Sequence, residues 1–220
     1  DGEEVTDPRW TFFTGGDVID AQPHPNAGDD DFDLFVTSVW QRVAEDFAPF
    51  NITVTTDVTI YDAADSDKRL HVVITPTKDV APETGGVALT GEAAQFRSAS
   101  PIVWVFHLDE YKCATTISHE AGHAFGLSHD SLIGLSPPDD YYSGHNDSYA
   151  TGWAPIMGAP FGDGFYDEVD QWSKGEYEDA NNILEDDLLM IGRPTNGFGF
   201  KDDDYSDLIS GDDVGALRAS

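Results

Sequence analysis

The residues best suited to chemistry are two histidines and a glutamate within one short stretch. His119 and His123 are four residues apart, a spacing that places both side chains on one face of a helix, about 40° apart and one turn along. Both imidazoles can therefore reach one metal ion. Glu120 lies about 100° around the same helix from His119, so its carboxylate can take a proton from a metal-activated water without binding the metal.

A glycine and a third histidine complete this pattern. Gly126 can adopt the left-handed conformation that ends a helix and reverses the chain, and His129 then returns to the metal. Three neutral imidazoles leave a fourth position for water, whose pKa zinc lowers to about 7. The site therefore predicts hydrolysis rather than a structural ion. The histidine pair alone arises by chance on ordinary amphipathic helices, whereas the longer string is far rarer by chance.

The twelve-residue string that begins at His119, HExxHxxGxxHD, resembles the metzincin clan of zinc endopeptidases. The clan's second feature is a methionine-containing turn below the metal, and by resemblance Met157 forms that floor. Asp130 directly after the third histidine is similar to the reprolysin or adamalysin branch, where this acid is buried and orients structure near the turn. The chain has one cysteine, Cys113, unlike the disulfide-bridged animal members, so a bacterial reprolysin-like group fits better.

The resemblance implies a secreted, monomeric zinc endopeptidase that acts on protein or peptide substrates. His119, His123 and His129 would hold the zinc, and Glu120 would be the general base. An antiparallel edge strand would pair with an extended substrate by main-chain hydrogen bonds, with a surface loop as the alternative for the same residues. That strand would consist of Gly86, Val87, Ala88 and Leu89.

A function from a different class is an adhesion or binding module that keeps the fold without catalysis. Such a module would use its acidic surface, loaded with calcium, to bind a partner. Glu120 argues against this alternative, because a binding module needs no base beside the metal.

The composition excludes several classes of partner. Among 220 residues, 11 are basic and 42 acidic, which gives a formal net charge of −31 that repels nucleic acids and anionic membranes. No apolar stretch approaches the roughly 20 residues that span a bilayer, so we expect no membrane insertion. The first residues have neither a basic nor an apolar leader region, so we expect any signal peptide or pro-segment to be absent from this chain.

Four acidic clusters offer the hard oxygen ligands that calcium prefers. None matches a defined calcium loop, so a solvated acidic face is the alternative to a structural calcium ion. The clusters lie at residues 29–33, 139–140, 163–168 and 202–204.

Hydrophobic periodicity predicts the elements that position the site. Apolar residues recur every three or four positions from Phe32 to Phe47, as in one buried face of a helix. A second helix carries the metal ligands. A third is predicted from Asn182, whose spacing to Glu185 suits a capping box, to a stop at Gly192. Strands are predicted by alternation over residues 52–60 and by apolar runs at 70–75, 102–106 and 85–91.

These elements predict an α/β, metzincin-like fold with a twisted mixed sheet, two long helices including the metal-binding one, and a loop-rich C-terminal lobe with one helix. Residues 1–192 would form a single catalytic domain, with an upper lobe to about residue 129 and a lower lobe over 130–192. Glycine, proline, aspartate, tyrosine and serine dominate from 129 to about 181, which predicts loops rather than a second sheet. Residues 193–220 are rich in glycine and aspartate and are expected to be a tail or linker.

Overall fold

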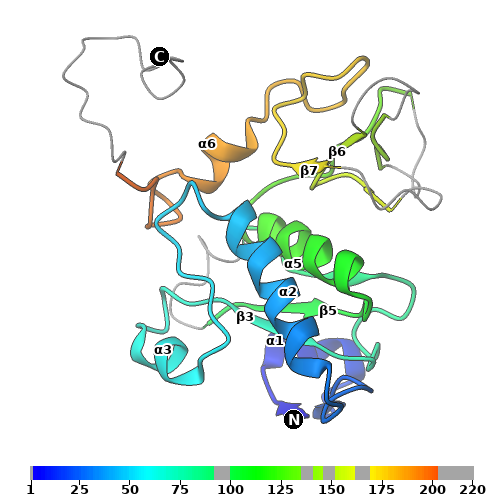
Figure 1. The fold of residues 1–220 in the computed structure, drawn as a ribbon, viewed down its shortest axis with the longest axis vertical. Coiled ribbons are helices and arrows are strands. Elements are labelled where there is room, and N and C mark those ends of the chain that lie inside the picture. The colour runs from blue at the N-terminus through cyan, green and yellow to red at the C-terminus, as the bar shows by residue number, and fades with distance from the viewer. Residues whose placement is uncertain (1, 92–99, 135–140, 146–151, 162–168, 203–220) are drawn as a thin grey trace.

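A computed structural model describes residues 2–91, 100–134, 141–145, 152–161 and 169–202. The chain is mixed α/β, with small sheets and short helices around two long helices (Figure 1). The elements are β1 (Glu3–Val5), α1 (Pro8–Thr11), η1 (Phe12–Thr14), β2 (Ile19–Ala21), α2 (Phe32–Asp46), α3 (Val58–Ala63), β3 (His71–Ile74), β4 (Gly86–Val87), β5 (Ile102–Val105), α5 (Glu110–Phe125), β6 (Trp153–Pro155), β7 (Val169–Gln171) and α6 (Asp187–Ile191).

A three-stranded mixed sheet in the order β3-β5-β4 supports the two long helices. β5 pairs parallel to β3 and antiparallel to β4. Side chains of β5 alternate between the two faces of the sheet. Val103 and Val105 pack with α2 and α5, whereas Ile102 and Trp104 pack with the N-terminal β1–β2 pair. The prediction of a mixed sheet with two long helices is confirmed.

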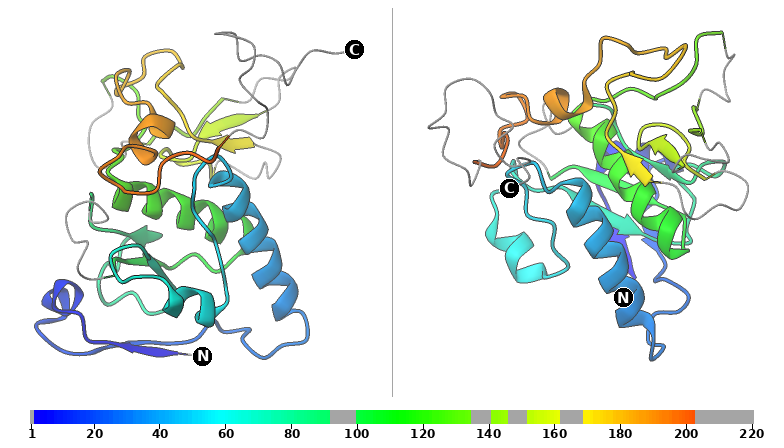
Figure 2. Two further views of the ribbon diagram at one scale, coloured as in Figure 1. Left: turned by 90° about the vertical axis from the view of Figure 1, so that its left-hand side faces the viewer. Right: turned by 45° about the horizontal axis from the view of Figure 1, so that its top comes forward.

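Helix α2 begins and ends close to the predicted residues. Val39, Val43 and Phe47 are buried against Ile117 and Ala121 of α5 in one core cluster. Figure 1 and the left view of Figure 2 show α5 between the sheet and the segment that carries β6, β7 and α6. Helix α5 therefore has the apolar core on one side and this later segment on the other.

The predicted strand over residues 52–60 is wrong. Its second half is helix α3, whose N-cap Asp57 accepts a hydrogen bond from the backbone N–H of Thr59 at 2.8 Å. Its first half forms no strand; the Trp40 indole N–H of α2 donates to the Val54 carbonyl at 2.9 Å. An N-cap aspartate competes with strand pairing for the same backbone groups, which the alternation pattern does not register.

The C-terminal part departs from prediction in two further places. Helix α6 starts five residues later than Asn182, because Asp186 is its N-cap and accepts from the Leu189 N–H at 3.1 Å. Its end at Gly192 is confirmed. The stretch expected to contain only loops includes two short parallel strands, β6 and β7, in which Trp153 pairs with Val169.

The segment after α6 packs onto the body of the molecule as far as residue 201. Phe198 lies against the core cluster. The Asn51 N–H donates to the Gly199 carbonyl, and the Lys201 N–H donates to the Pro49 carbonyl, each at 3.0 Å. The first part of the expected tail therefore belongs to the fold. Within the described residues, no helix has the length and apolar character needed to cross a bilayer.

Candidate metal centre

Helix α5 positions two of the three histidines. Asp109 caps its N-terminus by accepting from the Lys112 N–H at 3.1 Å, and most of its length is buried. The helix ends where the sequence predicts, at Gly126, whose φ of 104° lies in the left-handed region. The Arg193 guanidinium donates to the Phe125 carbonyl at 2.9 Å, so a side chain satisfies one carbonyl of the last turn.

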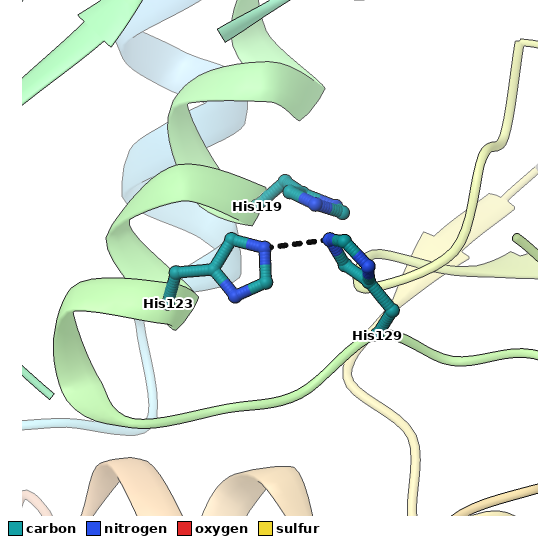
Figure 3. A group of neighbouring side chains, drawn as sticks. All are labelled: His119, His123 and His129. Carbon is teal, nitrogen blue, oxygen red and sulfur yellow. Dashed lines mark hydrogen bonds between the residues drawn. The ribbon is translucent and has the colours of Figure 1, made fainter. Parts of the chain in front are cut away.

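The structure brings His119, His123 and His129 together (Figure 3). One ring nitrogen of each lies within 4.8 Å of the others, which is close enough for one metal ion to bind all three. The Nε2 atoms of His123 and His129 are 2.8 Å apart and share a hydrogen bond.

Backbone carbonyls fix the orientation of the two helical histidines. His119 Nδ1 lies 2.7 Å from the Ile156 carbonyl oxygen, and His123 Nδ1 lies 2.9 Å from the Leu127 carbonyl oxygen. A carbonyl only accepts, so each Nδ1 carries the proton and each Nε2 presents a lone pair to the centre. This arrangement is typical of histidines that bind a metal.

Burial keeps the three imidazoles neutral near pH 7. Burial, together with the neighbouring His123, lowers the pKa of His119 to about 3 and that of His129 to about 4. The pKa of His123 is also lowered, chiefly by burial. Neutral imidazole is the form that binds metals, so protons compete weakly with a metal ion at physiological pH.

Glu120 is buried beside this cluster, at only 7% exposure. Burial raises its pKa to about 8, and a backbone hydrogen bond from Ala88 acts in the opposite direction. A Cβ on Gly86 would lie 2.8 Å from Glu120 Oε1, so only glycine lets β4 pass this close. The residues predicted as an edge strand therefore contact the predicted base, although only Gly86 and Val87 are in strand conformation.

Met157 is fully buried below α5. A Cβ on Gly122 would lie 2.6 Å from the Met157 sulfur, so the glycine makes room for the methionine. The Met157 carbonyl accepts from the Asp130 N–H at 2.9 Å, which connects the turn to the residue after His129. Met157 therefore lies against the helix that carries His119 and His123.

Asp130 is completely buried among polar groups. Its Oδ1 accepts from the Tyr177 hydroxyl at 3.1 Å, and its carbonyl accepts from the Tyr142 N–H at 2.8 Å. Burial raises the pKa of this carboxyl, and hydrogen bonds from Asn182 and Tyr177 oppose that shift. Asp130 thus joins the third histidine to the segments that follow it.

Sequence reasoning missed several side chains around the site. The Tyr141 ring centroid lies 4.5 Å from that of His129 and 6.1 Å from that of His119. The Asn181 amide donates to the His129 carbonyl at 3.1 Å, and the Glu185 carboxylate accepts from the Ser128 N–H at 2.8 Å. These residues lie 12 to 57 positions from the ones they contact, and no local pattern connects them.

The other candidate ligands stay apart from this centre. Among the described residues, the three histidines are the only group of three or more His, Cys, Asp or Glu side chains close enough to hold a metal. Cys113 is a buried thiol, as expected. Of the acidic clusters, residues 139–140 and 163–168 and most of 202–204 lie outside the described residues.

Comparisons of the chain with known protein families, with curated proteins and with solved structures found no match.

Proposed function

We propose that the protein is a zinc-dependent endopeptidase of the metzincin type, secreted and acting on protein or peptide substrates. The observation that carries the proposal is the convergence of three histidine nitrogens beside a buried carboxylate that follows the first of them in sequence. The complete HExxHxxGxxHD string and the buried Met157 support the same assignment.

The donor set suits zinc. Three neutral imidazoles, of which His119 and His123 have Nδ1 held by a carbonyl, form the nitrogen-ligand set found in catalytic zinc sites, which leave one position open. When bound, the zinc would supply a Lewis acid and lower the pKa of water.

Glu120 would perform the proton transfers of peptide hydrolysis. It would accept a proton from the attacking water and pass it to the leaving amine. Its raised pKa, about 8 in the metal-free protein, allows the carboxyl to hold that proton near neutral pH. Burial excludes bulk water that would otherwise exchange it.

Strand β4 would align the substrate. It has β5 on one side and, among the described strands, no neighbour on the other. An extended peptide that pairs with this edge would pass beside Glu120, because Gly86 touches the Glu120 side chain.

Cleavage of denatured casein by the zinc-loaded protein tests the proposal. We expect hydrolysis that a zinc chelator stops and added zinc restores. The Glu120→Gln variant should retain zinc and lose activity by at least about 100-fold, the contribution typical of a general base. Wild-type protein that binds zinc stoichiometrically and cleaves no substrate would support the alternative, a binding module. An active Glu120→Gln variant would contradict the mechanism.

A further inference from the structure

The C-terminal ends of helices α5 and α6 meet at the chain reversal that leads to His129. The side-chain nitrogen of Asn196 lies 3.2 Å from the carbonyl oxygen of Phe125, the last residue of α5. The same nitrogen lies 3.0 and 2.9 Å from the carbonyl oxygens of Met190 and Ile191, the last two residues of α6. Carbonyls in the last turn of a helix have no partner within that helix. One amide from the segment after α6 therefore serves both helix ends.

Arg193 brings a positive charge to the same place. Its Nη2 donates to the Phe125 carbonyl at 2.9 Å, and its Nη1 lies 3.7 Å from the Met190 sulfur. Within the described part of the chain, no ion pair includes Arg193, although the sequence contains 42 acidic residues. A cation stabilises the C-terminal end of a helix through the helix dipole. The guanidinium therefore binds the end of α5 rather than a carboxylate.

The guanidinium also packs on the backbone where the chain leaves α5. A Cβ on Gly126 would overlap Arg193 Nη2 and would lie 3.2 Å from its Cζ. The residues that follow hold two parts of the metal centre. The Leu127 carbonyl accepts from His123 Nδ1, and His129 supplies the third ring. Arg193 therefore contacts the one reversal on which both of these parts depend.

We propose that Arg193 is a positioning residue for the metal centre. Its guanidinium holds the reversal after Phe125 in the geometry that lets His129 reach the two helical histidines, and Asn196 ties the end of α6 to the same carbonyl. Arginine suits this role because its planar group carries several N–H donors in a fixed geometry. The residues that follow α6, expected from their composition to be a tail or linker, then support the metal centre. The inference rests on the proposed zinc site, and part of its test needs no metal.

The first experiment compares Arg193→Gln with Arg69→Gln. Arg69 is the matched control, because it donates to the carbonyl of Tyr61 in the last turn of another helix, α3, at 3.2 Å. We expect both changes to lower the free energy of unfolding, since each removes a hydrogen bond from a charged group. Only Arg193→Gln should also weaken zinc binding, by about 10-fold, the lower end for a residue that supports a metal ligand. It should also change the visible absorption spectrum of the cobalt-substituted protein.

A chromogenic chelator measures the zinc affinity of the folded variants. Wild-type affinity and an unchanged cobalt spectrum in Arg193→Gln would overturn the proposal, because the side chain would then only stabilise the fold. An equal loss of zinc affinity in Arg69→Gln would also overturn it. Arg193→Lys keeps the charge and loses the planar group, so its affinity should lie between those of wild type and Arg193→Gln. If Arg193→Gln does not fold, wild-type affinity in Arg193→Lys would overturn the proposal.

Amide hydrogen exchange in the metal-free protein separates this inference from the proposed function. The Leu127 N–H donates to the Gly122 carbonyl at 3.0 Å across the reversal. We expect Arg193→Gln to speed its exchange at least about 10-fold, because loss of a hydrogen bond from a charged group makes local opening easier. Arg69→Gln should leave this exchange unchanged. Unchanged exchange in Arg193→Gln would overturn the proposal, whereas wild-type protein that binds no zinc would contradict the proposed function.

Discussion

The part of the molecule up to Gly126 and the part after it hold the three clustered histidines by different means. His119 and His123 lie on a long helix packed in the apolar core. His129 lies on a chain reversal that polar side chains fix: the Asn181 amide, the Tyr177 hydroxyl and the buried Asp130. Apolar packing is non-directional, whereas these hydrogen bonds are directional. The first part therefore positions its histidines by burying a helix, and the second positions His129 by individual polar contacts.

Removing one ligand from each part gives the largest expected effect. His123→Ala on the helix and His129→Ala on the reversal should each lower zinc affinity by more than about 100-fold, which exceeds the loss typical of a supporting residue. Competition with a chromogenic chelator measures the affinity. If His129→Ala binds zinc as wild type does, the second part contributes no ligand and the three-histidine site is wrong.

Asp46 contacts both parts of the molecule. It lies at the end of α2, its Oδ2 accepts from the Ser118 hydroxyl of α5 at 2.5 Å, and its carbonyl accepts from the Trp172 indole. Burial raises its pKa to about 7 from an unfolded value of 3.8. Below about pH 3.8 the carboxyl is neutral in both states. As pH rises toward 7, the native state keeps a proton that the unfolded state has lost, so stability falls.

The Asp46→Asn variant should therefore gain stability relative to wild type as pH rises from about 4 to 7, by up to about 4 kcal/mol. Urea unfolding at a series of pH values measures the difference. The exposed Asp20→Asn change is the control, with no such trend expected. A difference that does not vary with pH would contradict the raised pKa.

Gly122→Ala tests how closely Met157 packs against α5. The added methyl would meet the Met157 sulfur and the Trp172 ring, at 2.6 and 3.2 Å from its Cβ. We expect a loss of about 1–3 kcal/mol in the free energy of unfolding, with weaker zinc binding. An unchanged free energy of unfolding in Gly122→Ala would mean that Met157 can move away from the helix at no cost.

Asn181→Ala should give the smallest effect. It removes the amide that donates to the His129 carbonyl and accepts from the Ser131 N–H. We expect zinc affinity to fall by about 10-fold, the lower end for a supporting residue. If Asn181→Ala lowered zinc affinity as much as His129→Ala does, the chain reversal that carries His129 would depend entirely on the Asn181 side chain.

The sequence predicted the first part of the molecule better than the second, for a physical reason. Helix α2, the metal-binding helix and its end at Gly126 follow from periodic burial and from backbone conformation, which local residues determine. The start of α6 differs from the prediction because Asp186 caps the helix, while the Glu185 carboxylate accepts from the Ser128 N–H instead of forming a capping box. Tyr141 went unnoticed for the same reason, since its contact with His129 depends on a distant chain reversal. Function and metal identity stay predictions.

The shortness of β4 has a consequence for self-association. An unpaired sheet edge is a template for pairing with another chain, and proteins limit this risk with short edge strands and charge. Here the edge strand is two residues long, and each molecule carries a formal charge of −31, so two copies repel each other. An edge of this length offers a second copy of the chain few backbone groups for pairing. Strand β4 therefore contributes little to the growth of an intermolecular sheet.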